Sequence, residues 1–234
     1  LSHLVDKIES AILRGKYALV VSMDIKGAFD NLKTESIEEA MVRNEYPVLF
    51  RNWYSNFLRK RLVWAEVLGE KVLIQPTCGA PQGGVLSPRA WNITFDPLLQ
   101  QLKDSGPCDP MAFADDIDLT FIGIDPNSLV RIAQPYLDKA VTFGKKTNLS
   151  FEPSKTTAVF FNRINGFDVT KVEKLYIEGV ELEPSDEMTF LGTVLDSKLC
   201  WGPQIRSKIE KVRRFLIMIK PIIGHSWGMS PKNL

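Results

Sequence analysis

The feature that most constrains this chain is an apolar stretch that leads into a carboxylate. Residues 17–25 read YALVVSMDI, with β-branched or other apolar side chains at most positions and Asp24 at the end. Because neighbouring side chains of a strand point to opposite faces, a stretch that is apolar on both faces predicts a strand buried on both faces. Asp24 is then a charged group placed where a buried strand ends.

A second block, residues 79–88, reads GAPQGGVLSP. Gly83 and Gly84 allow a backbone to approach a ligand with no side chain in the way, and Gln82 offers an amide that can hydrogen-bond a sugar, a base or a phosphate. The Ser-Pro pair that closes the block predicts the N-cap and first turn of a helix running to residue 102, and such a helix N-terminus favours anionic groups.

A third block, residues 113–116, reads FADD between apolar arms, which predicts a hairpin with carboxylates at its tip. Together with Asp24, this pair could hold two divalent cations, which prefer carboxylates and which stabilise the attacking and leaving oxygens of nucleotidyl transfer. Asp24 and Asp115 are the expected bridging ligands, and the carbonyl of Ile25 is a further donor. Asp116 can join them only if the tip is a turn, because adjacent strand residues face opposite ways. Any one of these aspartates alone would more often be a solvated turn residue.

Two further side chains suit the same chemistry. Phe29 lies five residues beyond Asp24, so its ring could pack beneath an incoming sugar and exclude a 2′-hydroxyl. Judged alone, this ring is equally well explained by core packing. Lys155 could donate a proton to a leaving pyrophosphate or offset its charge, and the alternative for a lysine in a Ser-Lys-Thr loop is a solvated side chain.

Composition limits the class of protein to which these blocks can belong. The chain has 234 residues, is 44% apolar and carries a net charge of +1, so it can bury a core, and a nucleic acid would have to be held by a local groove. Cys78, Cys108 and Cys200 are widely spaced without CxxC pairing, which argues for a reducing compartment, against a zinc site and for packing roles. No signal peptide and no apolar run long enough to span a bilayer is present.

The rest of the chain alternates helical and extended patterns. Leu1 falls inside an amphipathic pattern without a starting methionine, which predicts a fragment boundary. Pro135 predicts a kink or break in its helix, and Pro221 predicts the stop of the last one. The expected helices cover residues 34–43, 47–61, 128–146 and 205–223. The expected strands, besides a pair joined at Gly69-Glu70, cover residues 157–161, 174–177, 181–182 and 189–195.

The order, content and spacing of these blocks resemble the reverse transcriptases encoded by non-LTR (LINE-type) retrotransposons, particularly those of the jockey and R1 kind. The segments that resemble motifs A to E of that family are, in order, residues 21–30, 79–88, 113–116, 153–160 and 190–201.

The resemblance implies an α+β fold, a right-hand polymerase palm whose antiparallel sheet is backed by helices, with partial fingers and the start of a thumb. Residues 1–203 would form the palm and partial fingers, including a primer-grip hairpin at about residues 174–201. Residues 204–234 would begin the thumb or connection helix. The chain would be a fragment of a larger polyprotein, because upstream finger motifs, an endonuclease and most of a thumb are absent.

The activity implied is RNA-directed DNA polymerisation: addition of dNTPs to a DNA primer on an RNA template with two Mg²⁺ ions, which Mn²⁺ can replace. The compartments implied are the cytoplasm and the nucleus. The residue roles carried over by motif are metal binding for Asp24, Asp115 and Asp116, the sugar gate for Phe29, a contact near the nascent base pair for Gln82, the motif D lysine for Lys155, and the primer grip for Phe190, Leu191 and Gly192. Ile25, Gly83 and Gly84 are expected to contact the substrate as well, through their backbone.

Other functions fit the same sequence. A catalytically inactive, co-opted palm would bind nucleic acid or protein, although the three intact aspartates favour an enzyme. A group II intron maturase-like polymerase or an RNA-templated RNA polymerase is a second alternative, and the bulky Phe29 argues for deoxynucleotides. A third is a basic nucleic-acid-binding helix near the C-terminus, for which a solvated helix face is an equal explanation. Its basic residues are Lys208, Lys211, Arg213, Arg214 and Lys220.

Overall fold

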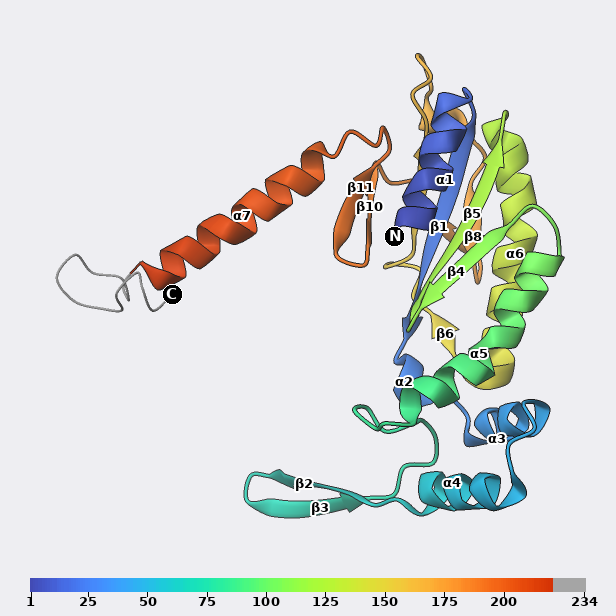
Figure 1. Cartoon of the computed structure of the whole chain (residues 1–234), viewed down its shortest axis with the longest axis vertical. Coiled ribbons are helices and arrows are strands. Elements are labelled where there is room, and N and C mark those ends of the chain that lie inside the picture. Colours follow the sequence, from blue (N-terminus) through green and yellow to red (C-terminus); the bar gives the residue numbers. More distant parts are fainter. Residues whose placement is uncertain (221–234) are drawn as a thin grey trace.

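A central antiparallel sheet organises the molecule (Figure 1). The computed structural model describes residues 1–220, the side chain of Val67 excepted. The sheet has the strand order β4-β5-β1-β6, and β7 also pairs with β1. The α+β class expected from the sequence is confirmed. The strands are β1 (Tyr17–Lys26), β4 (Asp109–Phe113), β5 (Asp116–Gly123), β6 (Ser150–Phe151) and β7 (Thr157–Phe161).

Both faces of this sheet are covered by other elements. Leu19 and Val21 of β1 face a core shared with α3 (Thr34–Arg43), α5 (Ser87–Asp104) and α6 (Pro126–Thr147). The alternate residues Ala18 and Val20 face a second core formed with α1 (Ser2–Leu13) and the hairpin of β10 (Glu187–Phe190) and β11 (Thr193–Asp196). The predicted burial of residues 17–25 on both faces is therefore confirmed.

One end of the molecule carries a helical pair and a projecting hairpin (Figure 1). The short helix α2 (Ala28–Asn31) follows β1, and α3 and α4 (Val48–Lys60) follow in turn, close to the predicted bounds. The strands β2 (Val63–Val67) and β3 (Glu70–Ile74) form a hairpin, as the sequence predicts, and within the described residues neither pairs with a further strand.

The other end carries two small hairpins and a long helix. After the short 3₁₀ helix η1 (Val169–Lys171) come β8 (Leu175–Ile177) with β9 (Val180–Leu182), β10 (Glu187–Phe190) with β11 (Thr193–Asp196), and α7 (Gly202–Ile219). The prediction of one strand over residues 189–195 is wrong. Leu191 and Gly192 have φ values of 49° and 74°, a left-handed pair that reverses the chain.

Pro135 does not break its helix. α6 is continuous through this residue, so of the predicted kink or break the break is wrong. A proline interrupts only one hydrogen bond of the ladder, and the buried row Leu129, Ala133 and Leu137 packs both halves on the same core. The predicted end of the last helix at Pro221 lies outside the described residues.

The three cysteines differ in their surroundings. Cys108 is buried in the first core as predicted, and Cys78 is partly buried. Cys200 is exposed, so its predicted packing role is wrong: its N–H donates to the Asp196 carboxylate at 3.0 Å in the loop before α7, and its side chain lies at the surface. Among the described helices, none has both the length and the apolar character that crossing a bilayer requires.

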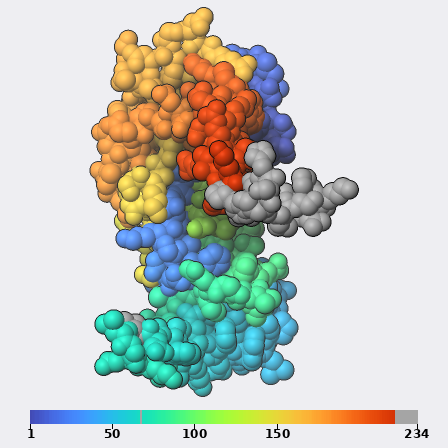
Figure 2. All heavy atoms as spheres, turned by 90° about the vertical axis from the view of Figure 1, so that its left-hand side faces the viewer, coloured from blue at the N-terminus to red at the C-terminus, as the bar shows by residue number. Residues whose placement is uncertain are grey.

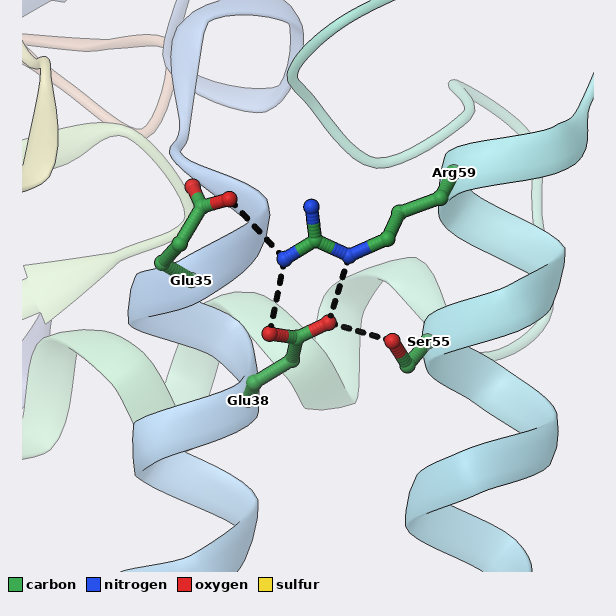
Figure 3. A network of polar contacts seen from close by, with 4 residues as sticks. All are labelled: Glu35, Glu38, Ser55 and Arg59. Carbon is green, nitrogen blue, oxygen red and sulfur yellow. Dashed lines mark hydrogen bonds and ion pairs between the residues drawn. The ribbon is translucent and has the colours of Figure 1, made fainter.

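A polar network joins α3 to α4 and so fixes the end that carries β2 and β3 (Figure 3). The Arg59 guanidinium donates to Glu38 with Nε–O and Nη2–O distances of 3.0 and 2.9 Å, and to Glu35 at 2.9 Å. The Ser55 hydroxyl also donates to Glu38. These bonds, with that from Arg59 first, hold the pKa of Glu38 below its usual range.

We expect Glu38→Gln to lower the free energy of unfolding near neutral pH and to have little effect in acid. A carboxylate whose pKa is lower in the folded state stabilises the fold above its unfolded-state pKa, and this contribution is lost as the pH falls through the folded-state value. Urea unfolding at about pH 7 and about pH 3 measures this difference. Glu39→Gln, on an exposed position of the same helix, is the matched control. An equal loss at both pH values would contradict the electrostatic account.

Candidate active site

The carboxylates predicted as metal ligands lie at one end of the central sheet. Asp24 on β1 is the register partner of Asp116 on β5. Phe113 and Asp116 are paired, so Ala114 and Asp115 form a two-residue turn, in which Ala114 has a φ of 54°. The tip is therefore a turn, which is the condition for both adjacent aspartates to approach one site. Asp116, whose role as a ligand depended on such a turn, is the one directly across from Asp24.

Negative charge accumulates at this end of the sheet. The pKa of Asp116 is raised by burial and by the charges of Asp115 and Asp24. In residues 1–220, no group of three or more His, Cys, Asp or Glu side chains forms a ready-made metal cage. The donor chemistry nevertheless fits a hard divalent cation whose remaining ligands are waters and substrate phosphates, because Mg²⁺ is commonly bound by one or two carboxylates. The site is an open cluster of carboxylates.

A turn after β6 places the ammonium group of Lys155 next to Asp24. The N–H of Glu152 donates to the carbonyl of Asp24 at 2.9 Å, and the N–H groups of Lys155 and Thr156 donate back to the carbonyl of Glu152 at 3.1 and 3.0 Å. This turn places Lys155 Nζ 3.3 Å from Asp24 Oδ2. Lys155 therefore lies at the predicted site, where its charge offsets that of a carboxylate.

Trp91, which the sequence patterns did not single out, connects the hairpin tip with Phe29. Its buried indole N–H donates to the carbonyl of Ala114 at 2.6 Å, and its ring lies 5.4 Å from the half-buried ring of Phe29, centroid to centroid. A buried tryptophan N–H needs an acceptor. A tryptophan in the first turns of the helix after the glycine-rich block was therefore the sequence feature that could have indicated this contact. Ile25 stays in β1, buried and paired with Phe151.

The glycine-rich block is fastened to the segment after β1. The N–H groups of Gly79 and Ala80 donate to the carbonyls of Leu32 and Phe29, both at 2.7 Å. Gly79 has a φ of 82°, and a Cβ there would collide with the backbone of residues 29–30. Gln82 Nε2 donates to Asp30 Oδ2 at 2.9 Å. This contact between Gln82 and Asp30 was not predicted from the sequence.

The two adjacent glycines of this block serve different purposes. Gly83 has a φ of 78° and open space where a side chain would lie, so its backbone is accessible. A Cβ on Gly84 would lie 2.7 Å from Ser87 Oγ, so a glycine at this position leaves room for the Ser87 hydroxyl. The prediction of Ser87 as N-cap is wrong: it is the first residue of α5, and its hydroxyl donates to the carbonyl of Pro81 at 2.6 Å. Leu86 occupies the N-cap position.

The predicted primer-grip residues form one hairpin tip. Phe190 is buried in the second core, and it anchors the exposed turn of Leu191 and Gly192. The helix α7 is attached to this hairpin: the N–H of Val194 donates to Gln204 Oε1 at 2.9 Å, and Lys208 Nζ donates to the carbonyl of Gly192 at 3.4 Å. The hairpin and the start of α7 therefore form one unit.

Asp118 is a buried carboxylic acid on β5, two residues after Asp116 and paired with Ser22 of β1. It is fully buried, and within the described residues neither of its oxygens has a hydrogen-bond partner of ordinary geometry. Burial, with a smaller contribution from the charge of Asp116, raises the pKa of Asp118 to about 6, although Ser22 on the facing strand acts to lower it. No feature of its neighbourhood in the sequence distinguishes it from an exposed strand residue.

Asp118→Asn should stabilise the protein at neutral pH. Because the pKa is higher in the folded state, ionisation destabilises the fold as the pH rises between the unfolded-state value of 3.8 and the folded-state value of about 6. The variant should gain about 3 kcal/mol in the free energy of unfolding at neutral pH, and the gain should vanish in acid. Urea unfolding across this range measures it. A gain independent of pH would show that ionisation of Asp118 is not its cause.

An antiparallel sheet flanked by helices, with carboxylates gathered where β1 and the β4–β5 hairpin end, is the architecture of a polymerase palm. The sequence pattern of the family described as reverse transcriptase (RNA-dependent DNA polymerase) matches residues 2–195. This match covers most of the chain, so the chain belongs to the reverse transcriptase family, whose members generally use divalent metal ions.

Its relatives are proteins of retrotransposons. The chain is 26% identical over 220 residues to a probable RNA-directed DNA polymerase from transposon BS of Drosophila melanogaster, with coverage of 92% of this chain and 24% of that protein. It is 23% identical to the Pol polyprotein from the type-1 retrotransposable element R1 of Bradysia coprophila, with coverage of 92% and 21%. The chain therefore spans about a quarter or less of the length of these relatives.

Similar solved structures come from telomerase. Apo telomerase from Candida tropicalis, truncated from its C-terminal domain, superposes with a TM-score of 0.59 at 12% identity over 84% of this chain and 38% of that one. Telomerase of the same species in complex with the TWJ fragment of telomeric RNA gives a TM-score of 0.56 at 12% identity over 86% and 33%. At this identity the likeness shows the fold, a right-hand polymerase palm.

Proposed function

We propose that this chain is the palm of a non-LTR retrotransposon polymerase and extends a DNA primer with dNTPs on an RNA template. The observation that carries the proposal is the pairing of Asp24 with Asp116, next to Asp115 in the turn, within a chain of the reverse transcriptase family. The retrotransposon relatives support the choice of substrate.

Two Mg²⁺ ions, which Mn²⁺ can replace, are the proposed cofactors. Asp24, Asp115 and Asp116 would hold them, with the carbonyl of Ile25 as a further donor. When bound, such ions stabilise the attacking 3′-oxygen and the leaving pyrophosphate. The raised pKa of Asp116 supports this role, because a carboxylate crowded by like charges gains from a nearby cation.

Lys155 has a proposed role that depends on its ion pair with Asp24. With no cation present, its ammonium offsets the charge of Asp24 at 3.3 Å. In the proposed reaction the Lys155 ammonium would leave this ion pair and turn towards the leaving pyrophosphate. There Lys155 would donate a proton or offset the developing charge.

The remaining residues are proposed to position the substrates. Phe29, held against Trp91, would lie beneath the sugar of the incoming nucleotide and exclude a 2′-hydroxyl. Gln82 would contact the nascent base pair, and the backbone of Gly83 and Gly84 would allow the substrate to approach closely. The hairpin tip of Phe190, Leu191 and Gly192 would hold the primer strand.

The division of the chain is also a proposal. Residues 1–203 would form palm and partial fingers, and residues 204–234 would begin the thumb. The start of α7 at Gly202 and its projection from the sheet support a boundary at this point (Figure 1). We place the polymerase in the cytoplasm and the nucleus on the resemblance to retrotransposon enzymes.

Primer extension tests the proposed reaction. The chain is given an RNA template, a DNA primer, Mg²⁺ and either dNTPs or rNTPs, with Asp115→Ala as the control. We expect extension with dNTPs that is lost in the control. Extension that persists in Asp115→Ala would show that this carboxylate is not needed, and equal use of rNTPs would contradict DNA synthesis. A chain that binds the hybrid but never extends it would favour a non-catalytic, co-opted palm.

A further inference from the structure

The turn that carries Asp115 has a backbone conformation that alanine does not favour. Ala114 and Asp115 are its two central residues, between the paired Phe113 and Asp116, and Ala114 has a φ of 54°. A positive φ at the first central position of such a turn is usually taken by glycine, because a Cβ is crowded by the backbone there. A strained residue of this kind persists only where the surrounding structure holds it. The turn therefore needs support from outside the hairpin.

This support comes from Trp91, the fifth residue of α5. Its indole N–H donates to the carbonyl of Ala114 at 2.6 Å. Among the hydrogen bonds of residues 1–220, it is the one that reaches residues 114–115 from outside the hairpin. Residues 113–115 are exposed, so packing in the core does not hold them. The hydrogen bond from Trp91 is therefore the contact that fixes the turn to the rest of the molecule.

The indole is itself held firmly in place. Trp91 is buried in the first core, where its ring is stacked on Phe95 at 5.2 Å and lies 5.4 Å from Phe29. Close packing of this kind keeps a side chain in one rotamer, so the core sets the direction of the indole N–H. α5 starts at the end of the glycine-rich block, whose N–H groups donate to the segment after β1; on the face shown in Figure 2 this segment (blue) and the block (green) are neighbours.

We propose that Trp91 is a positioning residue of the active site. Its indole N–H holds Ala114 at positive φ and thereby keeps Asp115 in the geometry in which it can bind a cation together with Asp24. A buried indole needs an acceptor, and any nearby carbonyl would meet that need. Here the acceptor belongs to the strained residue directly before a proposed metal ligand. The inference rests on the proposed polymerase function and deepens it.

The two contacts of Trp91 are expected to serve different purposes. The N–H acts on the turn and so on metal binding, whereas the ring packs against Phe29 and so supports the proposed sugar gate. A substitution that removes the N–H but keeps a ring should therefore weaken the binding of metal and leave the choice of sugar unchanged.

Trp91→Phe is this substitution. We expect its affinity for Mn²⁺, measured by electron paramagnetic resonance of the free ion, to fall about tenfold, the effect of losing one buried hydrogen bond. Its preference for dNTP over rNTP should stay as it is. Trp53→Phe, the same change at an exposed tryptophan of α4, should alter neither quantity. A purely structural Trp91 would instead lower the free energy of unfolding, measured in urea, with no change in Mn²⁺ affinity.

Ala114→Gly provides a second, independent test. Glycine adopts a positive φ without the steric cost that alanine incurs, so the turn should depend less on Trp91. In this background Trp91→Phe should weaken Mn²⁺ binding by less than about threefold, because the two residues act on the same turn. An equal loss in both backgrounds would overturn the proposal, as would Mn²⁺ binding by Trp91→Phe that is as tight as that of the unaltered chain.

A measurement without metal separates this inference from the proposed function. The scalar coupling between the amide and α protons of Ala114, measured by nuclear magnetic resonance, depends on φ and should change in Trp91→Phe but not in Trp53→Phe. An unchanged coupling in Trp91→Phe overturns the role of Trp91 whatever the chain binds. An unaltered chain that binds no Mn²⁺ contradicts the proposed metal site instead, and the coupling then still decides whether Trp91 holds the turn.

Discussion

Asp24→Asn is expected to reduce the rate of single-nucleotide incorporation by on the order of a thousandfold, because a carboxylate that holds a catalytic cation contributes several kcal/mol to transition-state stabilisation. The amide has nearly the same size and keeps its place on β1 opposite Asp116. It lacks the charge that attracts a divalent cation and the ion pair with Lys155. The fold should therefore persist while the chemistry fails.

The measurement is a rapid-quench incorporation assay with saturating dNTP and Mg²⁺, alongside a urea unfolding curve for each protein. Asp104→Asn, at an exposed position in the last turn of α5, removes the same charge from a residue outside the predicted site and should behave like the unaltered protein. An Asp24→Asn protein that keeps more than about a tenth of the rate would exclude Asp24 as an essential metal ligand.

Phe29→Val is expected to change the choice of sugar while leaving DNA synthesis largely intact. Without the ring that packs on Trp91, the space beneath the sugar can accept a 2′-hydroxyl. The preference for dNTP over rNTP, measured as a ratio of kcat/KM values, should fall by about 10- to 100-fold, the range that steric discrimination by a pocket usually provides. The rate with dNTP should change much less.

Phe29→Tyr is the control for this prediction, because it keeps the ring and its packing and should keep the preference. If Phe29→Val leaves the ratio unchanged, Phe29 is a core residue that supports α2, the alternative that its half-buried position also allows.

Local sequence patterns predicted the elements around the site well. The buried strand β1 followed from its apolar character on both faces, and the hairpin with carboxylates at its tip followed from the FADD block and its flanking arms. These features depend on neighbouring residues. The exact pairing of Asp24 with Asp116 depends on the register of two strands far apart in the chain, which no local pattern fixes.

Contacts between distant segments account for what the sequence did not predict. Trp91 reaches the carbonyl of Ala114, and Gln82 reaches Asp30, across long stretches of chain. Pro135 was expected to kink or break α6, yet the helix is continuous because packing on the core outweighs one lost hydrogen bond. The turn at Leu191 and Gly192 was missed because Leu is seldom found at positive φ, although the following glycine was a signal.

Mn²⁺ binding is the measurement that tests the central claim most directly, because it probes the carboxylates without requiring the rest of a polymerase. Electron paramagnetic resonance measures free Mn²⁺ as the chain is titrated, with Mg²⁺ as competitor. We predict that the unaltered chain binds Mn²⁺, that Mg²⁺ displaces it, and that Asp24→Asn and Asp115→Asn each lose this binding while Asp104→Asn retains it. Mn²⁺ binding that is unchanged in Asp24→Asn and Asp115→Asn would contradict a metal site at the end of β1 and β5.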